Sequence, residues 1–440
     1  MDKKFAGIIL AAGEGTRMKS DIPKVLHPIC GRPMLGYVLE LAKALKLSKI
    51  IVVAGNKKEL LQDLLDEYKA KAVCQDRRLG TADAVKIAQP ALVSFSGNIL
   101  ILYGDQPLLE AKTLKELIRK HLSAGACATI LSVHMENPCG YGRIVRDNYG
   151  RITAIIEDKD ATDEQKRIKE VNTGIICFKK NELFKAMAKI RPDNAKKEYY
   201  LTDAIKIMAR SGLSIESLSI VDDLEQAHGI NSRQDLAQAQ KIMRQRILGN
   251  LMSQGVGIID PQATYVDYDC KIGRDTIIYP FTVIEKDVII GKFCRLGPFC
   301  HLRPGSRIED RAVVGNFTEV ARSRIGKDTL MKHFSYIGDT AVGNNVNIGC
   351  GTVTANFDGK NKLKTVIGDN AFIGSDTILR APVKIGKKAV TGAGAVVTKD
   401  VKSGEVVVGV PAMPLKIKSK IKVQKSKSQT KMQKFKFPSK

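Results

Sequence analysis

Residues 265–302 read YVDYDCKIGRDTIIYPFTVIEKDVIIGKFCRLGPFCHL, and an aliphatic residue returns in this stretch at every sixth position. The spacing continues to residue 320, through Val266, Ile272, Ile278, Ile284, Ile290, Leu296, Leu302, Ile308, Val314 and Val320. Neither a helix nor an ordinary strand produces a period of six. The period predicts a parallel β-solenoid in which each six-residue unit forms one flat side and points one aliphatic side chain inward.

Further features of the second half fit this solenoid. Glycine often follows the aliphatic position, as at Gly273, Gly291, Gly297 and Gly315, and we expect these glycines to permit the turns. A single coil is too thin to bury a core, so the coils must stack on one another. Residues 354–364, TANFDGKNKLK, interrupt the repeat and are expected to form an external loop.

The first half of the chain alternates short apolar runs with amphipathic stretches, which is typical of a mostly parallel sheet covered by helices. The expected strands are Gly7–Leu10, Ile50–Ala54, Asn98–Tyr103, Ala128–Val133 and Ile175–Phe178. The expected helices are Lys58–Tyr68, Ala82–Leu92 and Ala111–Leu122, followed by a long connecting helix over Ser232–Met252. Ligands of such sheets bind at the carboxyl ends of the strands.

Composition narrows the class of protein. The 440 residues predict two or three domains, and 44% hydrophobic with 27% charged residues excludes a mainly disordered chain. Ten Lys and no acidic residue lie in residues 416–440, and without this tail the net charge falls from +25 to +15. We interpret the tail as disordered, and the remaining positive charge suits anionic ligands such as phosphates. Because Trp is absent and aromatic residues make up 5%, stacking on nucleic-acid bases is not favoured.

Nine Cys with no CxxC pair indicate reduced thiols in a cytoplasmic protein rather than a disulfide framework. The apolar run Phe5–Ala12 is too short to span a bilayer, and it runs into Gly13-Glu14-Gly15 rather than a cleavage site. We therefore expect neither a signal peptide nor stable membrane insertion.

A small-residue loop follows the first expected strand and reads LAAGEGTRM over residues 10–18, with PKVLH at residues 23–27. It lacks the closing GK[ST] of a Walker A loop and the third glycine of GxGxxG. Its backbone N–H groups can still approach a phosphate closely, and Arg17 and Lys24 add positive charge where a pyrophosphate would leave. By pattern alone, an ordinary strand-to-helix turn with surface cations fits equally well.

Later motifs decide between these interpretations. Residues 103–107, YGDQP, end an apolar strand with the carboxylate of Asp105, and they are followed by GYGRI, VNTGI, EYYLTD and HGINSR. This ordered set resembles the sugar-1-phosphate nucleotidyltransferases, and the solenoid resembles the hexapeptide-repeat acyltransferases, whose coils form a left-handed parallel β-helix. Together, residues 5–400 resemble the bifunctional N-acetylglucosamine-1-phosphate uridyltransferase/glucosamine-1-phosphate N-acetyltransferase family.

The resemblance implies roles for individual residues in the first half. Lys24 and Arg17 would face the phosphates and act in catalysis, and Asp105 and Asn231 would bind Mg²⁺. Taken alone, Asp105 could equally cap a loop and Asn231 could cap the connecting helix. UTP and the sugar would be held by Leu10, Ala11, Ala12, Gly13, Gln75, Gly80, Thr81, Tyr103, Gly104, Gly140, Glu157 and Asn172.

In the second half, the segment KHFSYIGD at residues 332–339 matches the family's histidine segment. The resemblance implies that His333 takes a proton from the amine of glucosamine-1-phosphate, which then attacks the thioester of acetyl-CoA. The amino sugar phosphate would contact Arg303, Tyr336 and Asn347. Acetyl-CoA would contact Cys350, Asn356, Phe357, Ser375 and Ala393, and the family assembles as homotrimers through the solenoid.

Two positions depart from the family pattern. Ala321 stands where a phosphate-binding Lys is usual, and either Arg322 or Arg324 could compensate. Gly409 stands near the place of an Arg that meets CoA, a contact that the Lys-rich tail could replace. Both changes question the specificity for glucosamine-1-phosphate more than acyl transfer itself.

The sequence therefore predicts an α/β nucleotidyltransferase domain at 1–231, a linker helix at 232–254, a β-helix at 255–415 and a tail at 416–440. The expected product is UDP-N-acetylglucosamine, a precursor for peptidoglycan and lipopolysaccharide. One alternative keeps nucleotidyl transfer but gives the solenoid another substrate or a purely structural role. A second is a non-catalytic regulatory assembly protein, which would need none of Arg17, Lys24, Asp105 and Asn231.

Overall fold

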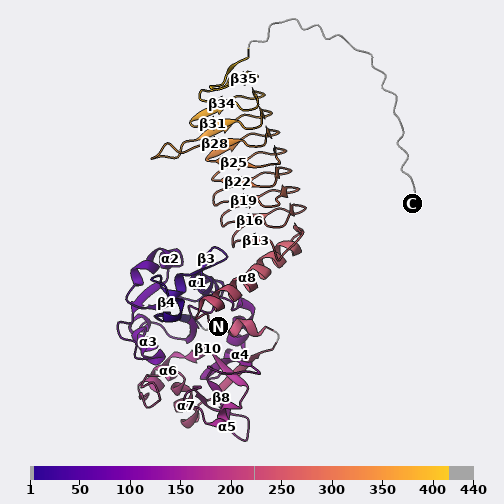
Figure 1. Cartoon of the computed structure of the whole chain (residues 1–440). Coiled ribbons are helices and arrows are strands. Elements are labelled where there is room, and N and C mark those ends of the chain that lie inside the picture. Colours follow the sequence, from indigo (N-terminus) through magenta and orange to yellow (C-terminus); the bar gives the residue numbers. More distant parts are fainter. Residues whose placement is uncertain (1–3, 222, 416–440) are drawn as a thin grey trace, which may run out of the picture. The chain divides into compact units, whose positions relative to one another are not determined.

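The computed structural model describes residues 4–221 and 223–415 (Figure 1). The chain divides into two compact units. Among the described residues, the first unit contains the residues up to Ile290 and also His301–Pro304. The second unit contains Gly291–Cys300 and the residues from Gly305 onward. The Lys-rich tail lies outside the described residues. The domain limits at 231, 254 and 415 remain predictions.

A mostly parallel sheet forms the centre of the first unit, in the order β11-β7-β10-β6-β1-β4-β5, with β8 and β9 attached to β10. Its strands are β1 (Phe5–Ala11), β4 (Lys49–Ala54), β5 (Lys71–Cys74), β6 (Asn98–Tyr103), β7 (Ala128–His134), β8 (Arg143–Arg146), β9 (Ile152–Ile156), β10 (Glu170–Lys179) and β11 (Ile215–Ile220). The expected strands are confirmed, and β10 is longer than expected and antiparallel to both of its sheet neighbours.

Helices cover both faces of this sheet. The helices that do so are α1 (Met34–Ala44), α2 (Gln62–Glu67), α3 (Thr81–Ile87), α4 (Ala111–Ser123), α6 (Lys180–Met187) and α7 (Asp203–Arg210). The short α5 (Asp163–Lys166) and the long α8 (Arg233–Ser253) contribute to neither of the two cores on these faces. Side chains alternate between faces along a strand, so Ile8 of β1 packs in the core with α3, α6 and α7, whereas Ile9 packs with α1, α2 and α4. Within the described residues, no helix has the length and apolar composition needed to cross a bilayer.

Two expected helices are shorter than the sequence pattern suggested. The segment 58–68 divides into a 3₁₀ turn, η3 (Lys58–Leu61), and α2, and the segment 82–92 divides into α3 and η4 (Gln89–Leu92). Pro90 lies at the start of η4, and because proline has no N–H to donate, it ends the regular helix before it. Two further 3₁₀ turns, η1 (Thr16–Met18) and η2 (Lys24–Leu26), follow β1.

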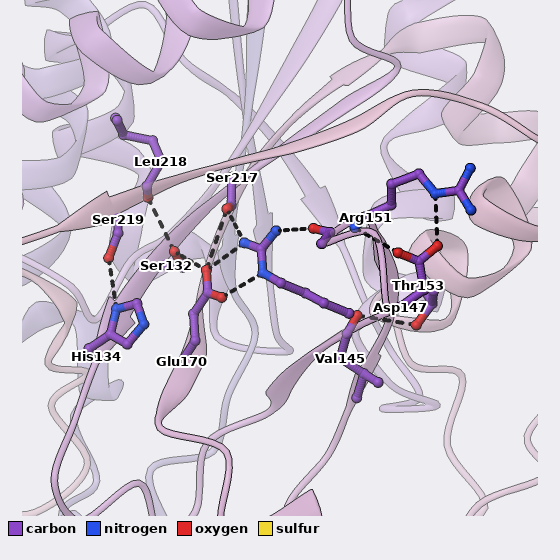
Figure 2. A network of polar contacts seen from close by, with 12 residues as sticks. Ser132, His134, Val145, Asp147, Arg151, Thr153, Glu170, Ser217, Leu218 and Ser219 are labelled. Atoms are coloured by element: carbon purple, nitrogen blue, oxygen red, sulfur yellow. Dashed lines mark hydrogen bonds and ion pairs between the residues drawn. The ribbon is translucent and has the colours of Figure 1, made fainter.

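A polar network fixes β10, the strand that carries Asn172. Arg146 donates two hydrogen bonds of 2.9 Å to the carboxylate of Glu170 and one of 2.7 Å to Ser217 Oγ. Ser132 Oγ donates to Glu170 Oε1 at 2.9 Å. Figure 2 shows the Glu170 carboxylate between Ser132 and Ser217. Glu170 on β10 is thus connected to β7 through Ser132, to β8 through Arg146 and to β11 through Ser217.

The repeat region forms the predicted parallel β-helix. Partner residues are 18 positions apart in the first unit, as at Lys271 and Ile289, and at the start of the second, and then 17 apart, as at Val313 and Leu330. The first unit contains β12 (Gly257–Ile258), β13 (Tyr265–Val266), β14 (Lys271–Ile272), β15 (Ile277–Ile278), β16 (Val283–Ile284), β17 (Ile289–Ile290) and β19 (His301–Leu302). The aliphatic residues point inward, as at Ile278 and Ile284, which are 0% and 1% exposed.

The second unit stacks its strands in three sheets (Figure 1). The first has the order β18 (Arg295–Leu296), β21 (Val313–Val314), β24, β27, β30, β33, β35 and β36 (Met413–Pro414). The second has the order β22, β25, β28, β31 (Ile378–Arg380) and β34 (Val396–Val397), and the third β20, β23, β26 (Thr340–Val342), β29 and β32 (Val383–Ile385). The strands that matter for the site are β20 (Arg307–Ile308), β22 (Thr318–Ala321), β23 (Arg324–Ile325), β24 (Leu330–Met331), β25 (Ser335–Gly338), β27 (Asn347–Ile348), β28 (Val353–Ala355), β30 (Phe372–Ile373), β33 (Val390–Thr391) and β35 (Val406–Val408). Between β28 and β29 (Thr365–Ile367) the chain forms the expected loop, closed by a bridge between Phe357 and Lys362.

The expectation that glycines after the aliphatic positions permit the turns is confirmed at Gly297, whose φ is 88°, but is wrong at Gly291 and Gly315. The backbone is left-handed three residues after the aliphatic position instead, at non-glycine residues such as Asp275, Phe281 and Arg311, with φ of 63°, 60° and 60°. Gly315 does not have positive φ, but a Cβ there would lie 1.9 Å from the carbonyl oxygen of Lys332. Glycine is needed at this position because successive coils approach closely.

We expect Gly315→Ala to lower the free energy of unfolding by about 3 kcal/mol, because the added methyl group forces two stacked coils apart. Gly249→Ala is the matched control: Gly249 is exposed in α8, and a Cβ there would meet nothing within 4 Å. That change should be neutral or slightly stabilising. Denaturant unfolding of both variants checks the expectation, and equal stabilities would contradict the role of close coil stacking.

Candidate functional site

The carboxyl ends of β1, β4 and β6 meet at one edge of the sheet because these strands are parallel neighbours. A pocket of about 290 Å³ opens at this edge. Of the predicted nucleotide-binding residues, it is lined by Leu10, Ala11, Ala12, Gly13, Lys24, Gln75, Gly80, Thr81, Tyr103 and Asp105. The structure thus brings residues from four separate motifs to one cavity.

Two distant motifs are joined behind this pocket. The amide of Gln75, buried in the wall, donates to the Gly80 carbonyl at 3.2 Å and to Asp83 at 2.8 Å, which fixes its orientation. A Cβ on Gly80 would lie 2.4 Å from the Tyr199 carbonyl oxygen, and Thr81 Oγ1 accepts from the Leu201 N–H at 3.0 Å. Gly80 itself has φ of 120°, and glycine is required here because the EYYLTD segment approaches it closely.

Lys24 stands at the junction of the nucleotide pocket and a second cavity. Its side chain is 8% exposed, and its ammonium group donates to the carboxylate of Asp105 and, at 3.1 Å, to Asn231 Oδ1. Asp105 lies two residues after the end of β6, and its carbonyl accepts from the Ile230 N–H at 2.9 Å. These contacts join the first loop, the end of β6 and the start of α8.

The alternative of Asn231 as the helix cap is wrong. Ser232 caps α8: its side chain accepts from the Asp235 N–H, and Asp235 accepts from the N–H groups of both Ser232 and Asn231 at 2.9 Å. The capping box therefore satisfies the helix end without the Asn231 side chain. This leaves the amide oxygen of Asn231 directed to Lys24.

The second cavity, of about 550 Å³, adjoins the first and contains the predicted sugar-binding residues. It is lined by Arg17, Tyr103, Asp105, Gly140, Glu157, Asn172 and Asn231 among others. Burial raises the pKa of Glu157, whose carboxylate accepts from Thr202 Oγ1 at 3.0 Å. Asn172 Oδ1 accepts from the Gly174 N–H at 2.9 Å. A Cβ on Gly104 would lie 3.2 Å from the Val25 side chain and 3.3 Å from that of Ala11.

Three residues of these cavities were not assigned from the sequence. Arg78 donates to the Ala12 carbonyl at 2.9 Å and pairs with Glu14, so it fixes the small-residue loop from outside. Glu198 lines both cavities, and Thr202 holds Glu157. The EYYLTD motif pointed to the segment of Glu198 and Thr202, and Arg78 lies between the predicted Gln75 and Gly80, although no role was assigned to it.

Asp105 and Asn231 suit a hard divalent cation. Both present oxygen donors, and the Lys24 ammonium group between them shows that this point accommodates positive charge. Among the described residues, no group of three or more His, Cys, Asp or Glu could hold a metal ion. A cation here would thus be bound by few protein oxygens, which fits Mg²⁺ because it keeps water and phosphate ligands.

In the second unit, four of the predicted residues form a column along the stacked coils. His333, Cys350, Ser375 and Ala393 each stand two residues after the inward residue of β24, β27, β30 and β33, which are successive neighbours in one sheet. All four are exposed. The column places His333 beside the positions predicted to contact acetyl-CoA.

A second group lies around Asp339. Arg322 donates to the two carboxylate oxygens at 2.7 and 2.8 Å, and the Asn356 amide donates to the same carboxylate. These hydrogen bonds lower the pKa of Asp339, and those from Arg322 have the largest effect. They outweigh the partial burial of the carboxylate, which acts to raise the pKa. A Cβ on Gly338 would lie 2.5 Å from Tyr336 Oη and 2.7 Å from Asn356 Nδ2, so the glycine makes room for both side chains.

The remaining predicted acyl-transfer residues are separated. Asn347 belongs to β27, whereas Tyr336 belongs to β25, and these strands lie in different sheets of the β-helix. Arg303 is exposed after β19, in the first unit, and Phe357 is exposed in the external loop. One chain therefore does not bring Tyr336 and Asn347 to the same face.

The two departures from the family pattern differ in their surroundings. Ala321 is buried at the end of β22, and Arg322 beside it contacts the group around Asp339. Arg324 is paired with Glu309 at 2.9 Å and lies in the sheet of β20 and β23 instead. Arg322 is thus the cation that lies near Tyr336. Gly409 follows β35 with φ of 89°.

The fold and the two sites define a nucleotidyltransferase joined to a hexapeptide transferase. Residues 7–171 match the MobA-like NTP transferase domain, and residues 269–300, 287–322 and 364–399 match the bacterial transferase hexapeptide repeats. The bifunctional protein GlmU of Carboxydothermus hydrogenoformans is 44% identical over 428 residues, which cover 90% of this chain and 95% of that protein. GlmU of Listeria monocytogenes is 41% identical over 434 residues, covering 91% and 94%. The chain belongs to the GlmU family of bifunctional proteins.

Proposed function

We propose that the chain acetylates glucosamine-1-phosphate with acetyl-CoA and then couples the product to UTP, forming UDP-N-acetylglucosamine and pyrophosphate. The observation that carries the uridyl-transfer step of this proposal is the convergence of Lys24, Asp105 and Asn231 beside two adjoining cavities. One cavity has the small-residue loop that suits a nucleotide, and the other has the polar side chains that suit a sugar.

Uridyl transfer needs no nucleophile from the protein. A phosphate oxygen of N-acetylglucosamine-1-phosphate attacks the α-phosphorus of UTP, and the bond to the β-phosphate breaks to release pyrophosphate. Leu10–Gly13 and Gln75 hold the uridine part, while Glu157 and Asn172 orient the sugar. Lys24 and Arg17 stabilise the negative charge that develops on the leaving group.

The proposed metal is Mg²⁺, held by Asp105 and Asn231 together with substrate phosphates. When bound, it supplies positive charge at the reacting phosphates. The direct contact of Lys24 with both residues means that the lysine and the metal share the same oxygen donors. We propose that Lys24 then directs its ammonium group to the phosphates.

In acetyl transfer, His333 acts as a general base. It takes a proton from the amine of glucosamine-1-phosphate, and the amine nitrogen attacks the thioester carbon of acetyl-CoA. The C–S bond breaks, the acetyl group is left on nitrogen, and coenzyme A leaves as the thiol. The exposed column of His333, Cys350, Ser375 and Ala393 supports this arrangement because these residues occupy equivalent positions on successive strands of one sheet.

Arg322 supports glucosamine-1-phosphate as the acceptor although Ala321 replaces the usual lysine. Its guanidinium group lies with Tyr336, Asn356 and Asp339 in one cluster. The competing proposal is a different amine as acceptor, which the burial of Ala321 favours. Thiol release from acetyl-CoA decides: release with glucosamine-1-phosphate supports the first proposal, and release only with another amino sugar supports the second.

We propose a homotrimer in which neighbouring β-helices complete the acyl-transfer site. The separation of Tyr336 and Asn347 on different sheets of one chain supports this, because a second chain can bring the two faces together. Light scattering should give three times the chain mass of 48.2 kDa at micromolar concentration. A stable single-chain mass with full acetyl transfer would contradict the trimer.

We also propose a cytoplasmic location and no binding of nucleic acid. None of the nine cysteines, which all lie in the described residues, forms a disulfide, and this supports a reducing compartment. RNA affinity that falls steeply with salt and disappears on deletion of residues 416–440 would contradict the second proposal.

A further inference from the structure

Arg233, the first residue of α8, reaches both 3₁₀ turns that follow β1. Its Nε donates to the Met18 carbonyl oxygen at 3.2 Å, and its Nη1 lies 3.4 Å from Nδ1 of His27. Met18 and His27 are 1% and 3% exposed, whereas Arg233 is exposed, so a surface arginine contacts two buried residues. Arg233 lines neither of the two cavities described above.

The two turns carry the cations of the nucleotide site. Met18 ends η1 directly after Arg17, and His27 follows η2, which begins with Lys24. The His27 N–H donates to the Lys24 carbonyl at 3.2 Å, so a displacement of His27 is passed to the backbone of Lys24. One side chain therefore holds the segments of both cations.

The position of Arg233 is itself fixed relative to Asn231. In the capping box, the Ser232 side chain accepts from the Asp235 N–H and the Asp235 side chain accepts from the Ser232 N–H. Asp235 also accepts from the Asn231 N–H. His27 can accept a hydrogen bond because burial and then the charge of Arg233 lower its pKa and keep the ring neutral. A planar guanidinium group can serve two acceptors in fixed directions, which a lysine cannot do.

We propose that Arg233 is a positioning residue for uridyl transfer: it sets Arg17 and Lys24 at the correct distance from Asn231, and so determines UTP and metal binding. The inference rests on the proposed uridyl transfer. Misplacement of catalytic groups by about 1 Å can cost roughly a hundredfold in rate. We therefore expect the effect of losing Arg233 to appear in UTP affinity and turnover rather than in folding alone.

The test compares Arg233→Met and Arg233→Lys with the unaltered full chain. Uridyl transfer is measured as kcat and KM for UTP over a series of Mg²⁺ concentrations, and UTP binding is measured by calorimetry. We expect Arg233→Met to weaken UTP binding about tenfold, to raise the Mg²⁺ concentration for half activity and to lower kcat at least tenfold. Arg233→Lys should recover part of each. Acetyl transfer in the same preparations reports folding and should stay unchanged.

Arg246→Met is the matched control. Arg246 also lies on α8 and binds a backbone carbonyl, that of Leu108 at 2.7 Å, and the carboxylate of Asp223 at 2.7 Å. This variant should keep the UTP affinity and the Mg²⁺ requirement. Any of three results would overturn the inference. Arg233→Met could bind UTP as tightly as the unaltered chain, Arg233→Met and Arg246→Met could lose the same amount of UTP affinity, or the unaltered chain could fail to bind UTP. If the unaltered chain binds UTP but forms no UDP-N-acetylglucosamine, the proposed function fails, and the calorimetry alone decides about Arg233.

Discussion

Replacing Asp105 with asparagine is expected to lower uridyl transfer by about a thousandfold. The change keeps the size of the side chain but removes the charge that binds both Lys24 and the proposed metal. Loss of one preorganised stabilising group commonly costs a hundred- to a thousandfold, and here two interactions are lost together. The reduction should appear in kcat, because the charge is needed most as pyrophosphate leaves.

Pyrophosphate release from UTP and N-acetylglucosamine-1-phosphate measures this effect, with acetyl transfer of the same preparation as the folding control. Asp147→Asn is a matched variant of an acid outside the site. Asp147 accepts from the N–H groups of Tyr149 and Arg151 in an exposed turn, which an asparagine oxygen can also do. It should retain full activity. Uridyl transfer within threefold of normal in Asp105→Asn would remove the proposed role.

The second large effect is expected from His333→Ala, which should lower acetyl transfer by about a thousandfold because a general base contributes between a hundred- and ten-thousandfold. Uridyl transfer should remain normal. His333 is exposed, so its loss should leave the β-helix folded. Release of the coenzyme A thiol measures the reaction.

The control for this prediction is His134→Ala. His134 is exposed at the end of β7, where its ring lies 3.2 Å from Ser219 Oγ, and no predicted acyl-transfer residue comes from that strand. It should retain normal acetyl transfer. If His333→Ala retained normal thiol release and His134→Ala did not, the base would have to be sought elsewhere.

Much of the fold could be predicted from periodicity. The period of six predicted both the stacking and the inward residues, since one aliphatic side chain per flat side is the minimum that buries a core. The role of glycine could not be predicted in the same way. Gly315 is required by the carbonyl of Lys332, 17 positions away, and such an approach between coils leaves no local signal.

Lys24 and Asp105 were assigned only through the resemblance carried by the ordered set of motifs, since each taken alone also fits an ordinary turn or a loop cap. Asn231 shows the limit of local reasoning: an asparagine before a helix looks like a cap, and only the capping box of Ser232 and Asp235 decides against it. Arg78 and Arg233 were missed for a related reason. Each acts on backbone carbonyls of a distant loop, and a carbonyl acceptor does not depend on the type of residue that presents it.

Phosphorus NMR of the full chain with UTP, N-acetylglucosamine-1-phosphate and Mg²⁺ tests the central claim most directly, because it follows both reacting phosphates at once. The convergence of Lys24, Asp105 and Asn231 predicts one pyrophosphate and one nucleotide sugar for each UTP consumed, and no reaction after chelation of the metal. An unchanged UTP spectrum with both substrates and the metal present, or product formation that persists in the chelator, would contradict it.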